Sequence, residues 1–426
     1  MTLPPPFGDR LLGLAEREYP GLEALYRDLH AHPELSGLER ETAARMAAEL
    51  EGPGLTVHRG IGGHGVVGVL ENGPGPAVMI RSDMDALPVA ERTGLPYAST
   101  VTTNVETRAV KVGVMHACGH DLHMAIMVGA VRLLSATRDG WSGTLLAVAQ
   151  PAEETGAGAR AMVRDGIFTR FPRPAYALAL HVDPNIPAGK IGYRPGIISA
   201  GSTSLDITVR GIGGHAAHPH QSIDPVVLAA RMVLALQTVV SREMDPREMA
   251  VLTVGAIHGG TKHNAIPDEV LLRVNIRYTS EAIRARMLAS IDRMMRGIAL
   301  SAGVPDDLLP VIRRPGEVTP PMENDPALTE RVRAILSSVL GEDNVLLIPQ
   351  LTGAEDFSVF GSGDPPVPLC YMRLGAGDPG DLEESRRTGK SLPYLHSSRF
   401  APPPDPTIRT GAVAMAAAVA GLLQPE

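Results

Sequence analysis

At 426 residues the chain is long enough for about two domains, and its 44% apolar and 20% charged residues are typical of a folded enzyme, not of a disordered or fibrous protein. The formal net charge of −8 excludes the basic footprint that binding to nucleic acid or to an anionic membrane needs. Small-molecule partners are therefore favoured.

The two ends of the chain carry no pattern of export or membrane insertion. Residues 1–10 lack the basic start and apolar core of a secretory signal, so we expect the mature chain to begin here. The longest apolar run, 411–423, is shorter than the roughly 20 residues that span a bilayer and predicts a buried helix. The only cysteines are Cys118 and Cys370, which fits a reducing compartment. The sequence predicts a cytoplasmic protein.

The first part of the chain alternates helix-like and strand-like segments. We expect helices at 21–30 and 39–50, and short buried strands, mostly parallel, at 77–80, 144–149 and 175–180. This alternation is typical of an α/β fold.

Three of these predicted strands run into side chains that can bind a metal. Because α/β folds collect their sites beyond the carboxyl ends of the strands, we expect these side chains to meet in one crevice. They are Asp83, Asp85, Glu153, Glu154 and His181. We interpret Glu154 as a metal ligand and Glu153 as the proton shuttle between water and a leaving amine. Asp85 is interpreted as a partner that orients a ligating histidine.

Residues 116–123, HACGHDLH, place a thiol and imidazoles on a short turn. Gly119 allows the turn, and Asp121 is expected to cap the helix that follows, which leaves Cys118 and His120 in the turn. Both could then reach a metal, and the helix start favours an anionic thiolate. An ordinary buried cysteine, or the nucleophile of a thiol hydrolase, are the alternatives for this thiol.

The roles of three residues near these motifs stay open. They are Asp83, His116 and His123. His181 and His396 are isolated histidines in apolar surroundings, and His396 follows the last predicted strand, so it must return to the crevice to take part.

The hydrophobic pattern changes near residue 197. From there the expected order is strand, helix, strand, strand, helix, strand, which is the ferredoxin-like order. These segments are 204–209, 224–240, 250–254, 269–278, 281–300 and 308–312. The α/β pattern then returns with helices at 326–340 and 355–360 and strands at 345–348 and 368–372. We predict a catalytic domain of residues 1–196 and 316–426, interrupted by an inserted domain of residues 197–315.

A series of motifs along nearly the whole chain resembles one family. The motifs are MIRSDMDALPVAERTGLPYAS, MHACGHDLHMA, QPAEETGAGARAMVRDGIF, LHVDPNIPAG, GIGGHAAHPHQSIDP, SREMDPREMAVLTV, GGTKHNAIPDEV and GAEDFS. They resemble the aminoacylase, hippurate hydrolase and indole-acetyl-amino-acid hydrolase family of metallopeptidase-like amidohydrolases. The chain differs from the family pattern at two places. The segment 101–114 before HACGH looks longer than the usual link, and Ser398 stands where the family more often has proline. Both differences concern substrate preference more than mechanism.

The resemblance implies a mixed-sheet, zinc-peptidase-like catalytic domain with two metal ions, and an inserted ferredoxin-like lid through which a homodimer or higher oligomer forms. The implied metal ligands are Cys118, His120, Glu154, His181 and His396, with Glu153 as general acid and base. In the lid, His215 matches a position that stabilises the oxyanion, in its own or a partner subunit's site. Asn264 and Arg277 match positions suited to binding a substrate carboxylate, for which an arginine fork is apt.

The predicted activity is hydrolysis of the amide bond of an N-acyl L-amino acid, with an acetyl, benzoyl or indole-acetyl type of acyl group. The predicted cofactors are two divalent ions, manganese or zinc, with cobalt or nickel also compatible. Alternative substrates within the family are dipeptides and N-acetyl-diamino acids. Outside it stand a thiol hydrolase that depends on Cys118 and a metal-binding protein without turnover.

Overall fold

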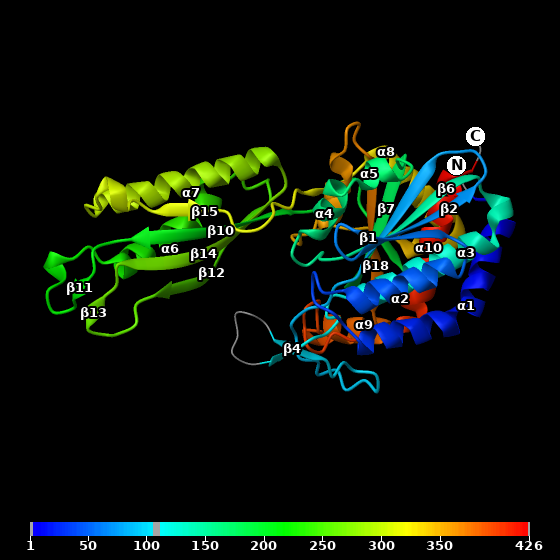
Figure 1. The fold of residues 1–426 in the computed structure, drawn as a ribbon, viewed down its shortest axis with the longest axis horizontal. Helices are drawn as coiled ribbons and strands as arrows, with labels where there is room; N and C mark the ends of the chain where they lie inside the picture. Colours follow the sequence, from blue (N-terminus) through cyan, green and yellow to red (C-terminus); the bar gives the residue numbers. More distant parts are fainter. Residues whose placement is uncertain (1–2, 105–110, 425–426) are drawn as a thin grey trace. The chain divides into compact units, whose positions relative to one another are not determined.

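The computed structural model describes residues 3–104 and 111–424 and divides into two compact units (Figure 1). Unit 1 holds the residues up to Ile198, together with Glu323–Gln350 and the residues from Asp356 onward. Unit 2 holds Ser199–Met322 and Leu351–Glu355. Residues 105–110, within the segment noted above before HACGH, lie outside the described residues.

Unit 1 is built on an eight-stranded mixed sheet, in the order β1-β2-β6-β3-β7-β18-β8-β17. The strands are β1 (Thr56–Ile61), β2 (Gly65–Asn72), β3 (Ala77–Asp83), β6 (Gly143–Gln150), β7 (Tyr176–Pro187), β8 (Ile191–Tyr193), β17 (Val345–Leu347) and β18 (Leu369–Gly377). The central strands β6, β3, β7 and β18 run parallel, whereas β1 and β2 pair antiparallel. Because helices cover both faces, the central strands are apolar almost throughout. The predicted mixed α/β class is confirmed.

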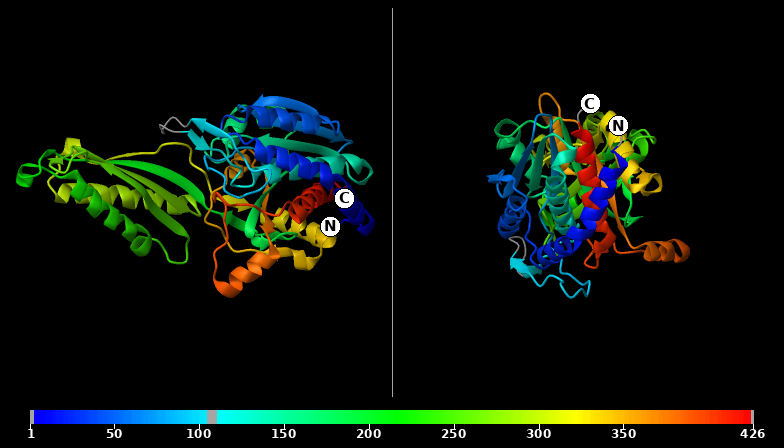
Figure 2. Two further views of the ribbon diagram at one scale, coloured as in Figure 1. Left: turned by 90° about the horizontal axis from the view of Figure 1, so that it is seen from below. Right: turned by 90° about the vertical axis from the view of Figure 1, so that its right-hand side faces the viewer.

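Helices α1, α3 and α10 pack against one another, and α3 and α10 also pack against the sheet (Figures 1 and 2). The helices of unit 1 are α1 (Pro5–Ala31), α2 (Arg40–Glu51), α3 (His120–Ala136), α4 (Gly158–Arg164), α5 (Ile167–Arg170), α8 (Pro326–Leu340), α9 (Pro379–Thr388) and α10 (Pro404–Leu422). The apolar run near the C-terminus forms the buried part of α10. Small residues let α3 and α10 approach closely, since a Cβ atom on Gly129 would lie 2.8 Å from the Cβ atom of Ala412.

The start of α3 differs from the prediction. The helix begins at His120, and its N-cap is Gly119 with a φ of 82°, so the expected cap by Asp121 is wrong. The reason is tertiary: the Asp121 carboxylate is bound by His30 Nδ1 at 2.6 Å. Cys118 still precedes the helix, whereas His120 is its first residue. The predicted helix at 355–360 is a 3₁₀ segment, Asp356–Ser362.

Unit 2 contains a four-stranded antiparallel sheet in the order β12-β14-β10-β15, with helices α6 and α7 packed on it. The elements are β10 (Gly201–Arg210), α6 (Pro225–Thr238), β12 (Ala250–Gly259), β14 (Glu269–Tyr278), α7 (Glu281–Ser301) and β15 (Val311–Arg313). A short pair of strands, β11 (Gly214–His215) and β13 (Ala265–Ile266), was not predicted. Two-residue strands give no periodic pattern in a sequence.

One helix among the described residues, Pro225–Glu243, is long and apolar enough to cross a membrane, and 33% of its most apolar window is buried. Length and composition do not distinguish such a helix from a core helix. Its Leu228, Met232 and Leu236 side chains pack into the core of unit 2. The packing of unit 2 therefore accounts for the apolar side chains on its buried face.

Candidate metal centre

Five side chains that the sequence singled out lie together at one end of the sheet of unit 1. The Sγ atom of Cys118 is 3.3 Å from Nε2 of His181 and 3.3 Å from Nε2 of His396. A Glu154 carboxylate oxygen is 3.4 Å from Nε2 of His396 and 4.0 Å from Nε2 of His120. The structure thus brings together a thiol, three imidazoles and a carboxylate from distant parts of the chain.

Backbone hydrogen bonds turn two of these imidazoles the same way. His120 Nδ1 donates to the carbonyl oxygen of Asp85 at 2.7 Å, and His181 Nδ1 donates to that of Val182 at 2.8 Å. A carbonyl oxygen only accepts, so both Nδ1 atoms carry protons. Burial holds the pKa of His181 well below its ordinary value, so its Nε2 lone pair faces the cluster. Burial also opposes protonation of His120, but neighbouring groups, Asp83 first, raise the pKa of His120 well above its ordinary value, and a cation at its Nε2 would take the place of the second proton. His396 is held through its backbone N–H, which donates to the carbonyl oxygen of Ala117 at 2.7 Å. Its φ is 67°.

Two polar atoms of the cluster are left unsatisfied by the described residues. Among the described residues, His120 Nε2 and Glu154 Oε1 are buried and have no hydrogen-bond partner. A buried polar atom left in this way costs about 1–3 kcal/mol. The single proton of the Cys118 thiol can satisfy only one of the two nearby imidazoles. A cation would satisfy all of these atoms, and sulfur, nitrogen and oxygen donors suit a divalent transition metal.

The electrostatics of Cys118 lead to the same conclusion. Burial, followed by the nearby Glu154 carboxylate, raises the pKa of the Cys118 thiol well above its ordinary value. The protein groups alone therefore favour the neutral thiol. A positive charge between the thiol and the imidazoles would make the thiolate stable. The residues present fit a metal.

Asp85 connects two members of the cluster. Its backbone carbonyl accepts from His120, and its carboxylate Oδ2 accepts from the backbone N–H of Glu154 at 2.9 Å and from Ser36 Oγ at 2.6 Å. Burial by itself would raise the pKa of Asp85, but His120, whose Nδ1 lies 3.3 Å from the carboxylate Oδ1, lowers it together with Ser36 and the backbone N–H of Glu154. This places Asp85 where the sequence expects a residue that orients a ligand.

His123 and Asp83 form a second support, behind His181. His123 Nδ1 donates to Asp83 Oδ1 at 2.6 Å, and His123 Nε2 accepts from the backbone N–H of Val182 at 2.9 Å. Burial lowers the pKa of His123, so the ring is neutral. Because both ring nitrogens are engaged, His123 fixes the backbone next to His181. Arg81 binds the other oxygen of Asp83 at 2.7 Å.

His116 differs from its neighbours. Both of its ring nitrogens are buried and, among the described residues, have no hydrogen-bond partner. Burial lowers the pKa of His116 to about 4, so the ring is neutral at physiological pH.

A buried ionic group, which the sequence reasoning missed, anchors the start of α3. His30 on α1 binds Asp121 Oδ2 at 2.6 Å and Glu91 Oε1 at 3.0 Å. Burial opposes protonation, but the two carboxylates, Asp121 first, raise the pKa of His30 to about 9. The imidazolium therefore ties α1 to the turn of α3 that carries His120. No local pattern around His30 indicates a partner 91 residues away.

Glu153 lies in the turn after β6, beside the cluster. One of its carboxylate oxygens, one of Glu154 and a nitrogen of His120 all lie within 4.8 Å of one another. The structure thus places Glu153 at the edge of the centre, near the two proposed ligands His120 and Glu154.

The three remaining predicted residues belong to unit 2. His215, on β11, accepts a hydrogen bond at Nδ1 from the backbone N–H of Ala217 at 3.0 Å, which leaves the proton on Nε2. The carbonyl of Asn264 accepts from Ala216 at 3.2 Å, so Asn264 lies beside His215. Arg277 is on β14, where Nε donates to the Asn275 side chain at 2.9 Å. Burial lowers the pKa of Arg277.

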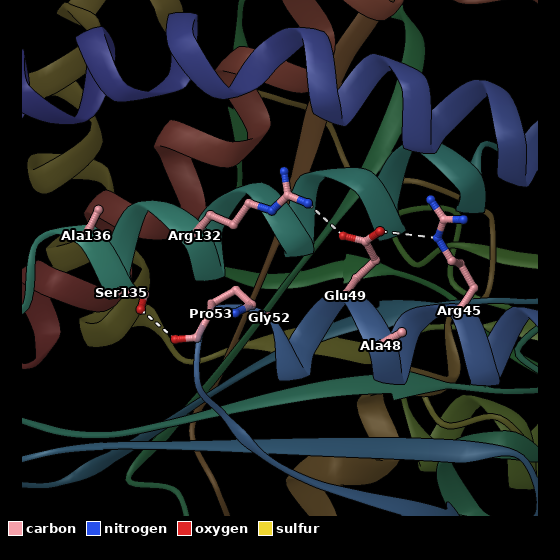
Figure 3. A pocket seen from close by; sticks show the side chains of 8 residues that line it. All are labelled: Arg45, Ala48, Glu49, Gly52, Pro53, Arg132, Ser135 and Ala136. Carbon is pink, nitrogen blue, oxygen red and sulfur yellow. Dashed lines mark hydrogen bonds and ion pairs between the residues drawn. The ribbon is translucent and has the colours of Figure 1, made fainter.

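A surface hollow of about 660 Å³ between α2 and α3 is separate from this cluster (Figure 3). Its arginines are already paired: Arg132 and Arg45 bind Glu49 at 2.6 Å and 3.2 Å. With its charges compensated and no predicted site residue in its lining, the hollow does not compete with the centre.

Comparisons with known proteins agree with this geometry. Residues 79–386 match the model of peptidase family M20/M25/M40. The chain is 35% identical to the N-acetyl-L-cysteine deacetylase of Bacillus subtilis, over 80% of each chain. It is 33% identical to the IAA-amino acid hydrolase ILR1-like 4 of Arabidopsis thaliana, over 82% of this chain and 77% of the relative.

Among solved structures, the chain is similar to the Bacillus subtilis YXEP protein, described as a dinuclear metal binding peptidase from the M20 family. The TM-score is 0.75 at 26% sequence identity, with 95% of this chain and 98% of the other covered.

Proposed function

Because the chain belongs to peptidase family M20/M25/M40 and is a hydrolase, we propose that it cleaves the amide bond of N-acyl L-amino acids with two bound metal ions. The observation that carries this proposal is the convergence of five donor side chains in unit 1. They are Cys118, His120, Glu154, His181 and His396. Buried polar atoms that have no hydrogen-bond partner among the described residues support a role in binding cations.

We propose manganese or zinc as the native ions. Thiolate and imidazole donors suit zinc, cobalt or nickel, and the carboxylate also admits manganese. Two ions held there would supply Lewis-acid chemistry, with a lowered pKa for the attacking water and a polarised scissile carbonyl.

Within this proposal, Glu153 moves the protons. Its carboxylate takes a proton from the attacking water and returns it to the nitrogen of the leaving amino acid. Its place next to Glu154 and near His120 supports this role, because a general base must reach the water beside the cations.

The residues of unit 2 would bind the charged parts of the substrate. The Nε2–H of His215 is a neutral donor suited to the developing oxyanion, and its tautomer is fixed by the backbone of Ala217. Asn264 and the Arg277 guanidinium would bind the carboxylate of the amino-acid half. The hydrogen bond from Arg277 to Asn275 supports this role, because it holds the fork in place before substrate arrives.

We also propose that the enzyme forms a homodimer through unit 2. β12 lies at the edge of the four-stranded sheet, and its Ile257 is exposed. Val227 and Leu234 on α6 are exposed as well, Leu234 by 73%. An open strand edge and apolar side chains together support association. Light scattering after size exclusion would contradict the proposal if it gave one chain's mass at micromolar concentration.

A reducing cytoplasm is the proposed compartment. Cys118 and Cys370 are both unpaired thiols, and the proposed role of Cys118 requires that it stay reduced.

The decisive experiment removes and restores the ions. Protein stripped with a chelator should lose hydrolysis of N-acetyl, benzoyl and indole-acetyl amino acids and regain it with added manganese or zinc. Dipeptides and N-acetyl-diamino acids complete the panel, since they are the alternative substrates. A thiol hydrolase would be indifferent to the chelator and inactivated by alkylation, and that result would overturn the proposal.

A further inference from the structure

The turn that carries Glu153 and Glu154 contains an unusual backbone conformation. Ala152, directly before Glu153, has a φ of 52°, in the left-handed region. A residue with a Cβ atom adopts this conformation at a cost, so it persists only where the surroundings impose it. The direction of Glu153 and Glu154 depends on that conformation, because both follow Ala152 in the same turn.

Two carboxylates from other segments hold the turn on either side of Glu153. Glu39 Oε1 accepts from the backbone N–H of Ala152 at 2.7 Å, and Asp85 Oδ2 accepts from that of Glu154 at 2.9 Å. Glu39 lies 113 residues before Ala152 in the chain. The backbone N–H groups of the residues before and after Glu153 are thus both held by carboxyl oxygens from other segments.

The loop that carries Glu39 is itself rigid and reaches both anchors. Glu39 Oε1 also accepts from the backbone N–H of Gly37 at 2.9 Å, and the Glu39 carbonyl accepts from Ala43 at the start of α2. In the same loop, Ser36 Oγ donates to Asp85 at 2.6 Å. The loop between α1 and α2 therefore contacts the acid turn directly and through Asp85.

Glu39 is a costly residue in this place. Its side chain is completely buried, and burial raises its pKa. Its second oxygen, Oε2, is buried without a hydrogen-bond partner among the described residues. Stability alone would favour an apolar residue over such a carboxylate. Its hydrogen bond with the backbone N–H of Ala152 instead suits a role in orienting Glu153 and Glu154.

We propose that Glu39 is a positioning residue, which fixes the direction of Glu153 and Glu154 by holding Ala152 in the left-handed conformation. The inference rests on the proposed function for Glu153 and Glu154, but not on which substrate is cleaved. Glu39 acts through the backbone of the turn, and neither substrate nor metal ion need touch it.

The test compares Glu39→Ala with a matched control, Glu34→Ala. Glu34 also binds the start of α2, where it accepts from the backbone N–H and the hydroxyl of Thr42, both at 2.7 Å. E39A should lower kcat at least about tenfold with KM changed less than about threefold, since misplaced catalytic groups act on the transition state. E34A should destabilise α2 and leave kcat unchanged.

Glu39→Gln tests whether the acceptor oxygen is what matters. The amide keeps an oxygen for the Ala152 N–H, so kcat should stay within about threefold of the wild type. If E39A does not fold, Glu39→Asp replaces it. Asp keeps the charge but withdraws the oxygen from Ala152, and should lower kcat.

Calorimetric titration of the chelator-treated protein with zinc or manganese gives a readout without turnover. E39A should bind one ion about tenfold more weakly, because Glu154 is no longer held, whereas E34A should bind as the wild type does. Wild-type kcat and affinity in E39A, or an equal loss of kcat in E34A or E39Q, would overturn the inference. If the wild type hydrolyses no N-acyl amino acid, the proposed function fails, while the titration still decides the role of Glu39.

Discussion

The Sγ atom of Cys118 lies 3.3 Å from the Nε2 atom of His396, although 278 residues separate them in the chain. One partner precedes α3 and the other lies in a loop near the C-terminus. Only the return of the chain after β18 brings them together, so the cluster requires the complete fold of unit 1. Substitution of either Cys118 or His396 can therefore test its chemistry.

Replacing Cys118 by Ala should weaken metal binding on the order of 100-fold. Loss of a residue that only supports a ligand costs roughly 10–100-fold in affinity, and this substitution removes a proposed ligand itself. Turnover should fall with metal occupancy and partly recover at high metal concentration. Titration of chelator-treated protein measures the affinity directly. Cys370→Ala is the matched control: this thiol is buried as well, on β18, and its loss should cost stability without loss of metal.

Replacing Glu153 by Gln should separate binding from chemistry. The amide cannot accept the proton of the attacking water, so kcat should fall by about 10²–10⁴-fold, while both ions stay bound. Elemental analysis of the purified variant beside the wild type checks occupancy. A variant that turns over normally would contradict the assignment of the proton shuttle, and one that loses its ions would show that Glu153 is a ligand.

The sequence predicts part of this centre from local patterns. Glu154 and His181 follow buried strands, and the carboxyl ends of parallel strands meet at one edge of a sheet. His396 has no such pattern, and its proposed place depended on the other motifs and on the resemblance of the whole chain. The structure brings these residues together, and their role as ligands stays a prediction.

The features that local reasoning missed depend on long-range contacts. Asp121 looks like a helix cap, but a histidine on α1 binds its carboxylate, and a glycine takes the cap position. Glu39 was not singled out from the sequence, because its contact with the backbone of Ala152 exists only in the folded chain. In each case the partner lies about 100 residues away in the chain. Hydrophobic periodicity indicates local secondary structure and does not predict such contacts.

Replacing Arg277 by Lys should raise KM for N-acyl amino acids about tenfold with little change in kcat, because an ammonium cannot form the two parallel bonds of a guanidinium. Steady-state kinetics should be run with the acid and with the corresponding carboxamide, which lacks the charge. Arg273→Lys is the control, since Arg273 is on the same strand and faces Asp206 at 4.0 Å. An equal effect on the carboxamide would exclude recognition of the carboxylate.

His30 predicts a pH dependence of stability in the alkaline range. The pKa of His30 is raised from 6.5 to about 9 in the folded protein by the carboxylates of Asp121 and Glu91. A raised folded-state pKa means that the folded protein holds the proton more tightly. The stabilisation is therefore complete below pH 6.5 and is lost as the pH rises through about 9. A shift of this size corresponds to on the order of 3 kcal/mol.

Urea unfolding of the wild type and of His30→Gln, between pH 6 and pH 10, measures this contribution. The difference in unfolding free energy between the two proteins should be largest at pH 6 and shrink as the pH passes 9, because only the wild type has the His30 proton to lose. His32→Gln is the matched control, since the His32 side chain is 74% exposed. It should leave the slope unchanged. A constant difference between wild type and H30Q would mean that His30 is already neutral at pH 6, and the ionic anchor of α3 would have to be abandoned.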